Sequence, residues 1–152
     1  MYRTKTCGEL NINNAGEKVE LAGWIQKKRN LGGMEFIDLR DEFGITQIII
    51  NDEKLQEQAK EFTTESCIHV EGKVVERSNK NKNIKTGEIE VIAEKIEVLG
   101  KCKNILPFEV NTDQEVREDL RLEYRFLDLR NQKLHDTILL RSKILKAFRD
   151  KM

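Results

Sequence analysis

The sequence predicts a mainly β protein: a small barrel of five strands, with one helix between the third and fourth strands, followed by further helices. Apolar and polar residues alternate at period two in five separate stretches, which is typical of half-buried strands. Apolar residues recur at helical spacing over 52–62 and again after residue 112. At 152 residues, the chain is long enough for one domain with a core and a further segment.

The clearest strand pair is expected within residues 34–50, with a tight turn at 41–44. In its first strand, alternation places Ile37 and Leu39 on one face and Phe36 on the other. Since the aliphatic pair should face the core, Phe36 is expected to point outward among charged residues.

In the second strand of this pair, Ile48 and Ile50 are expected to join the core, which leaves Gln47 beside Phe36 on the open face. An exposed aromatic ring next to an amide, with Arg40 nearby, suits stacking a nucleic-acid base and hydrogen-bonding its edge. A solvated sheet face with one stray phenylalanine is the alternative interpretation, since single exposed apolar side chains are common.

A strand is predicted ahead of this pair, over 18–28, with Gly23 in its middle as the site of a bend or bulge. Residues 30–33, which contain two glycines, are expected to form a flexible loop. The inward-facing residues of the strand are expected to be Val19, Leu21 and Ile25.

The helix is predicted over 52–62, with Asn51 or Asp52 as its N-cap. Two further strands, over 67–77 and 88–98, flank a polar and basic loop. The residues expected to face the core in this part of the chain are Leu55, Ala59, Phe62, Ile68, Val70, Val74, Ile89 and Val91.

This order of elements matches an OB-fold barrel. Such barrels bind oligonucleotides on the face of their second and third strands, and with the loops that join strands 1–2 and 4–5. Here that face carries Phe36 and Gln47, the first loop carries Arg29 and Leu31, and the second is the lysine- and asparagine-rich segment 78–87. Three expected ligand positions coincide, which favours nucleic-acid binding over a plain solvated face.

The charge balance restricts how nucleic acid could bind. Lysine plus arginine and aspartate plus glutamate number 27 each, so any contact must be local, and a generic single-strand binder is disfavoured. The three separated cysteines, Cys7, Cys67 and Cys102, are typical of ordinary thiols in a reducing compartment. No signal peptide or membrane-spanning run is recognisable, so we expect a cytoplasmic protein with no membrane partner.

No catalytic group or metal site is recognisable in the sequence. His69, on a predicted strand, and His135, on a predicted helix, have no cysteine or carboxylate at metal-ligand spacing, and both are expected at the surface. No glycine-rich segment carries the lysine and serine of a phosphate-binding loop. The chain by itself is therefore expected to bind rather than to catalyse.

Beyond the barrel, the single proline, Pro107, lies in a segment typical of a linker. Residues 112–115 form a capping box that predicts a helix. That helix would continue through Val116, Leu120, Tyr124 and Leu127. A second helix is predicted from near Asn131, with an apolar stripe formed by Leu134, Ile138, Ile144, Leu145, Phe148 and Met152.

Several short motifs together closely resemble the start of bacterial aspartyl-tRNA synthetases, which are class II enzymes. They are Thr-Cys-Gly-Glu-Leu at 6–10, Gly-Trp-Ile at 23–25, Arg-Asn-Leu-Gly at 29–32, Phe-Ile-Asp-Leu-Arg-Asp at 36–41, Gly-Glu-Ile-Glu at 87–90, and Arg-Leu-Glu-Tyr-Arg-Phe-Leu-Asp-Leu-Arg at 121–130. The asparaginyl and lysyl sister synthetases share the barrel but usually differ in the last motif, and they are one alternative. An OB module for protein–protein interaction is another.

The resemblance implies an anticodon-binding OB-fold domain over 1–103, a helical hinge over 104–130, and the first helix of a truncated catalytic domain over 131–152. In that family this helix builds the dimer interface, so the intact enzyme would be a homodimer. The intact enzyme would use ATP and Mg²⁺ to activate aspartate and would transfer it to tRNA(Asp). This chain alone would lack the active site and would need no cofactor or metal.

The resemblance also implies roles for single residues. Phe36 would stack under an anticodon base, Gln47 would read the central uracil, and Glu90 would read the first base, a guanine. Arg29 and Arg77 would hold a backbone phosphate or a base edge. The remaining candidates are Leu31 in the loop over the anticodon, Ile49 where some members carry an aromatic, and Asn81. Some members have histidine at the Leu31 position and accept both aspartate and asparagine tRNAs, so leucine favours a discriminating enzyme.

Overall fold

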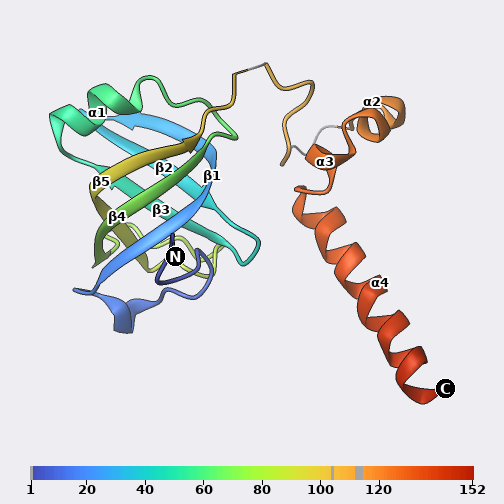
Figure 1. Ribbon diagram of the computed structural model, residues 1–152. Coiled ribbons are helices and arrows are strands. Elements are labelled where there is room, and N and C mark those ends of the chain that lie inside the picture. Colours follow the sequence, from blue (N-terminus) through green and yellow to red (C-terminus); the bar gives the residue numbers. More distant parts are fainter. Residues whose placement is uncertain (1, 104, 112–114) are drawn as a thin grey trace. The chain divides into compact units, whose positions relative to one another are not determined.

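The computed structural model of the chain describes residues 2–103, 105–111 and 115–152, and it divides into two compact units (Figure 1). The first unit, Met1–Lys103, is a β-barrel, and the second, Asn104–Met152, is helical. All strands of the described residues lie in the first unit.

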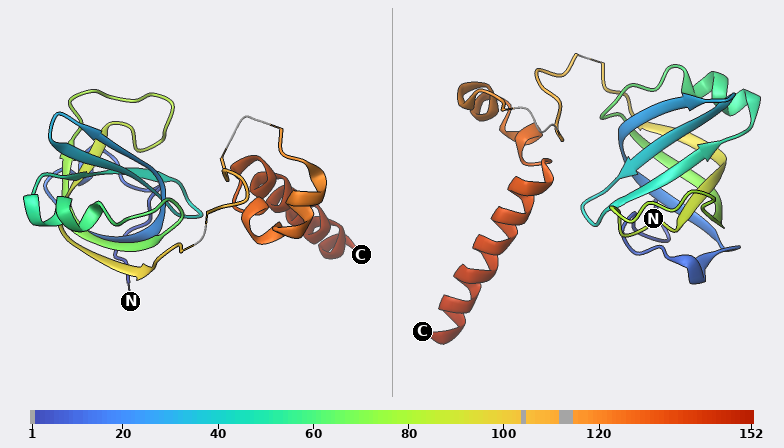
Figure 2. Two further views of the ribbon diagram at one scale, coloured as in Figure 1. Left: turned by 90° about the horizontal axis from the view of Figure 1, so that it is seen from above. Right: turned by 180° about the vertical axis from the view of Figure 1, so that it is seen from behind.

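Five strands form the barrel. They are β1 (Lys18–Leu31), β2 (Met34–Arg40), β3 (Ile45–Ile50), β4 (Cys67–Glu76) and β5 (Ile89–Gly100), with the helix α1 (Glu53–Ala59) between β3 and β4 and a short 3-10 helix, η1 (Ile12–Asn14), before β1. The sheet closes in the order β1–β2–β3–β5–β4, and every pair is antiparallel except β3 with β5 (Figure 2). The predicted five-stranded OB-fold with its helix between the third and fourth strands is confirmed.

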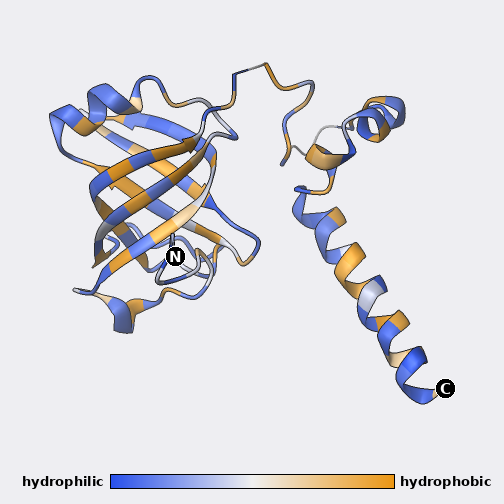
Figure 3. Ribbon diagram, viewed as in Figure 1, coloured by the Kyte–Doolittle hydropathy of each residue, from blue (hydrophilic) through white to orange (hydrophobic). Residues whose placement is uncertain are grey.

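Inward-facing aliphatic side chains fill the barrel, and Figure 3 shows apolar segments alternating with polar ones along its strands. Burial of such side chains supplies the main favourable free energy of folding. The residues predicted for this core are buried, apart from Leu55, which is partly buried and packs against it. The alternation in the sequence therefore identified the inner face of each strand correctly.

The helix α1 begins at the predicted N-cap. The side chain of Asp52 accepts hydrogen bonds from the backbone N–H groups of Lys54 and Leu55, each at 3.0 Å. The helix ends at Ala59, before the predicted end at residue 62, yet Phe62 still packs into the core.

The prediction of a flexible loop over 30–33 is wrong. β1 continues to Leu31, whose register partner is Met34, so Gly32 and Gly33 form a two-residue hairpin turn. Their φ angles are +61° and +82°, a region that glycine adopts without the steric cost of a Cβ atom. A tight turn therefore joins β1 to β2.

Of the predicted bend or bulge at Gly23, the bulge does not occur at this residue, which instead marks a close backbone approach. A Cβ atom at this position would lie 2.4 Å from the carbonyl oxygen of Arg40, which leaves no room for a side chain. The shift in register with β2 lies further along β1, between Ile25 and Lys27.

Two residues expected on the outside are buried. Arg40 forms an ion pair with Glu65, and its Nη2 atom lies 2.9 Å from each carboxylate oxygen. His69 is 6% exposed, lies edge-on to the ring of Tyr2 at 6.5 Å between centroids, and lies 3.7 Å from the carboxylate of Glu20. Alternation assigns a side chain to a face of the sheet, but it does not reveal what covers that face.

The second unit contains the helices α2 (Glu118–Glu123), α3 (Arg125–Asp128) and α4 (Gln132–Lys151). Of the predicted capping box, residues 112–114 lie outside the described residues. The predicted continuous helix through Leu127 is interrupted at Tyr124, whose φ and ψ are −104° and 45°. Two short helices therefore replace one.

The helix α4 begins as predicted, because the side chain of Asn131 accepts hydrogen bonds from the N–H groups of Lys133 and Leu134. Most of the predicted apolar stripe is exposed within this unit: Ile138, Ile144, Leu145, Phe148 and Met152. Figure 3 shows apolar segments along α4. None of the helices formed by the described residues is long and apolar enough to cross a membrane.

Replacing Glu65 by glutamine (Glu65→Gln) is expected to lower the free energy of unfolding by about 3–5 kcal/mol, because the guanidinium of Arg40 stays buried without its counter-charge. Urea denaturation of the chain, followed by circular dichroism, measures this loss. The control is Glu57→Gln, which breaks an exposed ion pair with Lys60 on α1 and should change little. Equal, small effects of both variants would show that the Arg40–Glu65 pair does not support the barrel.

Candidate nucleic-acid interface

One outward face of the barrel gathers several of the predicted site residues. Cross-strand pairs place Arg29 of β1 opposite Phe36 of β2, and Phe36 opposite Ile49 of β3, so these three residues lie in a row. Asp38 and Gln47 form a further pair on β2 and β3. We call this surface the Phe36 face, and its residues are Arg29, Phe36, Asp38, Gln47, Ile49 and Glu90.

An ion pair holds Arg29 on the Phe36 face. Its Nη2 atom lies 2.7 Å from Oδ1 of Asp38, which is two residues beyond Phe36 and points to the same side of β2. The guanidinium is thereby kept close to the aromatic ring, where it can contact the phosphate or the edge of a stacked base. Sequence reasoning missed Asp38, although the alternation of β2 places it on the side of Phe36.

Gln47 and Glu90 meet because β5 pairs with β3. Nε2 of Gln47 donates a hydrogen bond to Oε2 of Glu90 at 3.1 Å. The prediction that Gln47 is exposed is wrong, since only 4% of Gln47 and 8% of Glu90 are accessible to solvent. Both side chains belong to the outward face of the barrel, yet both are covered.

Burial raises the pKa of Glu90, because the ionised carboxylate loses part of its hydration. The positive charge of Arg77 and the hydrogen bond from Gln47 act in the opposite direction, with smaller effects. Arg77 directly follows β4, and its backbone N–H donates to the carbonyl oxygen of Glu88 at 2.9 Å, just before β5. A ligand that donates hydrogen bonds to Glu90 would therefore stabilise its ionised form.

Leu31 and Ile49 differ sharply in exposure. Leu31 ends β1 at the hairpin turn and is 60% exposed, whereas Ile49 is 7% exposed. Phe36, between them in accessibility, is half-buried. The open apolar surface in this region therefore comes from Phe36, Leu31 and Met34, the last of which is 42% exposed. Ile49 supports Phe36 from the neighbouring strand.

The segment 78–87 forms a compact loop. The backbone N–H of Asn81 donates to the carbonyl oxygen of Gly87 at 2.9 Å, and the Asn81 side chain accepts from the N–H two residues further on, at 3.0 Å. The hydroxyl of the buried Thr86 donates to the carbonyl oxygen of Ile45, which ties the loop to the start of β3. Asn81 therefore shapes this loop in the free protein.

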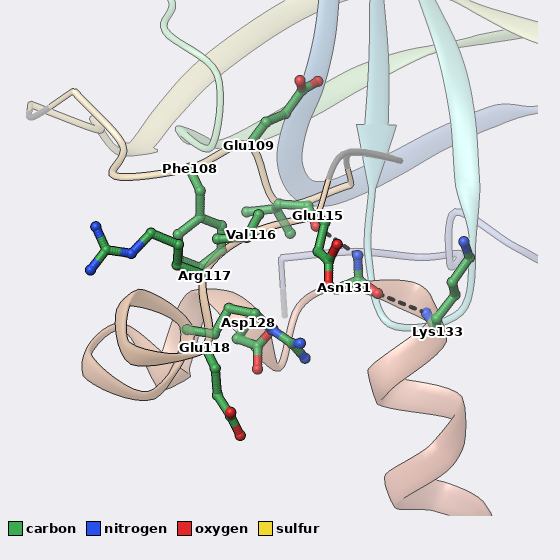
Figure 4. A pocket seen from close by; sticks show the side chains of 11 residues that line it. Phe108, Glu109, Glu115, Val116, Arg117, Glu118, Asp128, Asn131 and Lys133 are labelled. Atoms are coloured by element: carbon green, nitrogen blue, oxygen red, sulfur yellow. Dashed lines mark hydrogen bonds and ion pairs between the residues drawn. The ribbon is translucent and has the colours of Figure 1, made fainter.

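A separate pocket of about 640 Å³ lies within the second unit (Figure 4). Phe108 and Val116 line it together with charged residues, including Arg121 and Asp128. The buried carboxylate of Asp128 pairs with Arg121 at 2.9 Å and also with Arg125, so this cluster links α2 to α3. None of the predicted site residues lines this pocket.

Metal-ligating residues do not cluster in the part of the chain that the structure describes: it contains no group of three or more histidine, cysteine or acidic residues that could hold an ion. The buried Cys7 has a pKa raised far above the usual thiol value, chiefly by desolvation. Its thiol is therefore a structural group in the core and not a reactive one.

A five-stranded barrel whose outer face combines an aromatic ring, an arginine and a paired amide and carboxylate defines a nucleic-acid-binding OB-fold domain. A family model described as the OB-fold nucleic acid binding domain of the tRNA anticodon type matches residues 19–99. The chain therefore belongs to this anticodon-binding OB-fold family.

The chain is similar along its whole length to aspartate–tRNA ligases. It is 51% identical to the aspartate–tRNA(Asp/Asn) ligase of Pelagibacter ubique and 46% identical to the aspartate–tRNA ligase of Streptomyces coelicolor, over 99% of its residues in each case. It spans 26%, about a quarter, of the length of each relative.

The chain is also similar in structure to a solved aminoacyl-tRNA synthetase. The crystal structure of asparaginyl-tRNA synthetase from Pyrococcus horikoshii, complexed with asparaginyl-adenylate, superposes with a TM-score of 0.82 at 29% identity. The match covers 99% of this chain and 34% of that one. The resemblance to aspartyl-tRNA synthetases is confirmed, and the barrel belongs to the anticodon-binding OB-fold family.

Glu90→Gln is expected to raise the melting temperature of the chain at neutral pH. Because the pKa of Glu90 is raised, the folded chain binds this proton more tightly than the unfolded chain, and stability falls as pH rises from the usual glutamate range through the raised pKa. Glutamine does not titrate. The melting temperatures of the variant and the natural chain should therefore differ little near about pH 4 and most near about pH 8.

Thermal unfolding followed by circular dichroism at both pH values measures this effect. The control is Glu94→Gln, which removes an exposed carboxylate of β5 that pairs with Lys18. If Glu90→Gln changed the melting temperature by the same amount at both pH values, the raised pKa of Glu90 would be contradicted.

Proposed function

We propose that the Phe36 face reads the anticodon loop of tRNA(Asp). The single observation that carries this proposal is the gathering of Phe36, Gln47 and Glu90 on one face of a barrel in the anticodon-binding family. Phe36 is half-buried, so its ring is anchored in the sheet and remains open enough to stack with an unpaired base. Arg29, held by Asp38, contacts the neighbouring phosphate or base edge.

Glu90 and Gln47 supply the groups that distinguish bases. A carboxylate accepts hydrogen bonds from N1–H and the amino group of guanine, a donor pattern that no other base presents, so Glu90 reads the first anticodon base. The Gln47 amide offers both a donor and an acceptor, which match the edge of the central uracil. Arg77 neutralises the charge around Glu90 and contacts the backbone.

The other candidates have supporting roles in this proposal. Leu31 projects from the β1–β2 hairpin and covers an apolar part of the bound loop. Asn81 stabilises the 78–87 loop by a hydrogen bond and contacts the RNA from this loop. Ile49 contributes by supporting Phe36, because it is too buried to stack with a base itself.

In the intact protein we infer an aspartate–tRNA ligase that activates aspartate with ATP and Mg²⁺ and transfers it to tRNA(Asp). This chain supplies the anticodon contact, followed by the hinge over 104–130 and the first helix of the catalytic domain over 131–152. We further propose that the intact enzyme works in the cytoplasm as a homodimer that contacts its partner through this helix.

A second candidate function concerns the breadth of specificity. The relatives include ligases named for aspartate tRNA alone and others named for both aspartate and asparagine tRNAs. Leu31 favours the discriminating form. Comparing binding to stem-loops with the anticodons GUC and GUU tests this point, since a dual-specificity enzyme should bind both equally.

Phe36→Ala is expected to weaken binding of an anticodon stem-loop by about 5- to 150-fold, because one base loses a stacking contact of about 1–3 kcal/mol. Fluorescence anisotropy at one fixed salt concentration measures the dissociation constant, with a GUC loop and a loop whose central uracil is changed. Phe43→Ala is the matched control, since Phe43 is also an exposed aromatic but lies in the β2–β3 turn, against Arg3.

Binding that prefers GUC, depends on Phe36 and ignores Phe43 would support anticodon recognition. Equal binding to both loops would refute base-specific recognition and favour a generic single-strand binder. A chain that binds neither loop but associates through Leu145 and Phe148 would support the alternative of a protein-interaction module.

A further inference from the structure

Glu90 is held differently from Glu65, which is another buried carboxylate of the barrel. Both oxygens of Glu65 receive the guanidinium of Arg40 at 2.9 Å. Within the described residues, Glu90 accepts one side-chain hydrogen bond, at Oε2 from Gln47. Since a carboxylate offers about four acceptor positions, Glu90 retains acceptor capacity that the free protein does not use.

Gln47 retains hydrogen-bonding capacity as well. Its amide nitrogen carries two hydrogens, and its bond to Glu90 uses one of them. The second hydrogen and the carbonyl oxygen form a donor and acceptor pair, which complements the N3–H donor and carbonyl acceptors of uracil. Gln47 can therefore hold Glu90 and contact a base at the same time.

The surroundings of the pair make this hydrogen bond a strong constraint. Both side chains are less than a tenth exposed, so little water is available to replace the bond if it breaks. Arg77 attracts the Glu90 carboxylate from the end of β4. The hydrogen bond from the amide of Gln47 to Oε2 of Glu90 restrains this carboxylate and thereby the direction in which its free acceptor positions point.

We propose that Gln47 is a positioning residue for Glu90, so that the first and central bases of the anticodon are recognised as one coupled unit. This inference rests on the proposed anticodon-binding function. Independent recognition predicts that altering Gln47 affects only the central base. Coupled recognition predicts that altering Gln47 also weakens the preference for guanine at the first base, although Glu90 is unchanged.

The test measures binding of the chain to three anticodon stem-loops, GUC, AUC and GCC, at fixed salt by fluorescence anisotropy. Gln47→Met keeps the length of the side chain and removes its hydrogen bonds, and Gln47→Asn keeps the amide but shortens its reach. Both should reduce the preference for GUC over AUC by about tenfold, the effect of one lost hydrogen bond to a charged group. Glu57→Gln, on α1 and outside the Phe36 face, should leave all preferences unchanged.

A double-mutant cycle shows whether Gln47 affects the first-base preference through Glu90 or independently of it. Glu90→Gln should remove the first-base preference, and adding Gln47→Met to it should cause little further loss of that preference. Titration of the Glu90 carboxyl by NMR gives a readout without RNA. The pKa of Glu90 should rise further in Gln47→Met, because the hydrogen bond that favours its ionised form is gone.

The outcomes are distinguishable. If the natural chain prefers GUC over both other loops and Gln47→Met keeps the full first-base preference, the coupling is refuted and the proposed function stands. If the natural chain shows neither preference, the proposed function fails and the coupling fails with it. Gln47→Asn covers the case in which Gln47→Met does not fold, as judged by circular dichroism.

Discussion

Closure of the barrel by the parallel pairing of β3 with β5 is the constraint on which the site depends. Two parallel strands cannot be joined by a hairpin and need a long crossover, which α1 and β4 provide here. The described register pairs are Ile48 with Val91 and Ile49 with Ile92, so the adjoining residues Gln47 and Glu90 meet. No single pair of consecutive strands contains the complete Phe36 face.

Two of the buried carboxylates of the barrel, Glu65 and Glu90, are stabilised in different ways. Glu65 is neutralised by Arg40 at both oxygens, so its charge is matched and its role is structural. Glu90 is held by a neutral amide, and its desolvation is only partly offset by Arg77. A site that must accept donors from a ligand needs the second arrangement, because a fully paired carboxylate has no remaining attraction for a base.

The alternation of apolar residues and the capping motifs in the sequence predicted the core residues and the start of α1 correctly. Alternation placed Ile37, Leu39, Ile48 and Ile50 in the core and Phe36 outside, and the Asp52 cap fixed the start of α1. These predictions succeeded because each depends on neighbours within a few residues. The hairpin at Gly32 and the interruption at Tyr124 were missed, although both are local, because the sequence allowed other backbone conformations.

The sequence by itself determined which residues face the core, where the strands and α1 lie, and which motifs match the anticodon-binding family. Only the tertiary structure decided how deeply Gln47, Arg40 and His69 are covered and which partners they meet. The physical reason is that a side chain's face follows from its position along a strand. Its burial and electrostatic environment depend on segments that are distant in sequence and become neighbours only when the barrel closes.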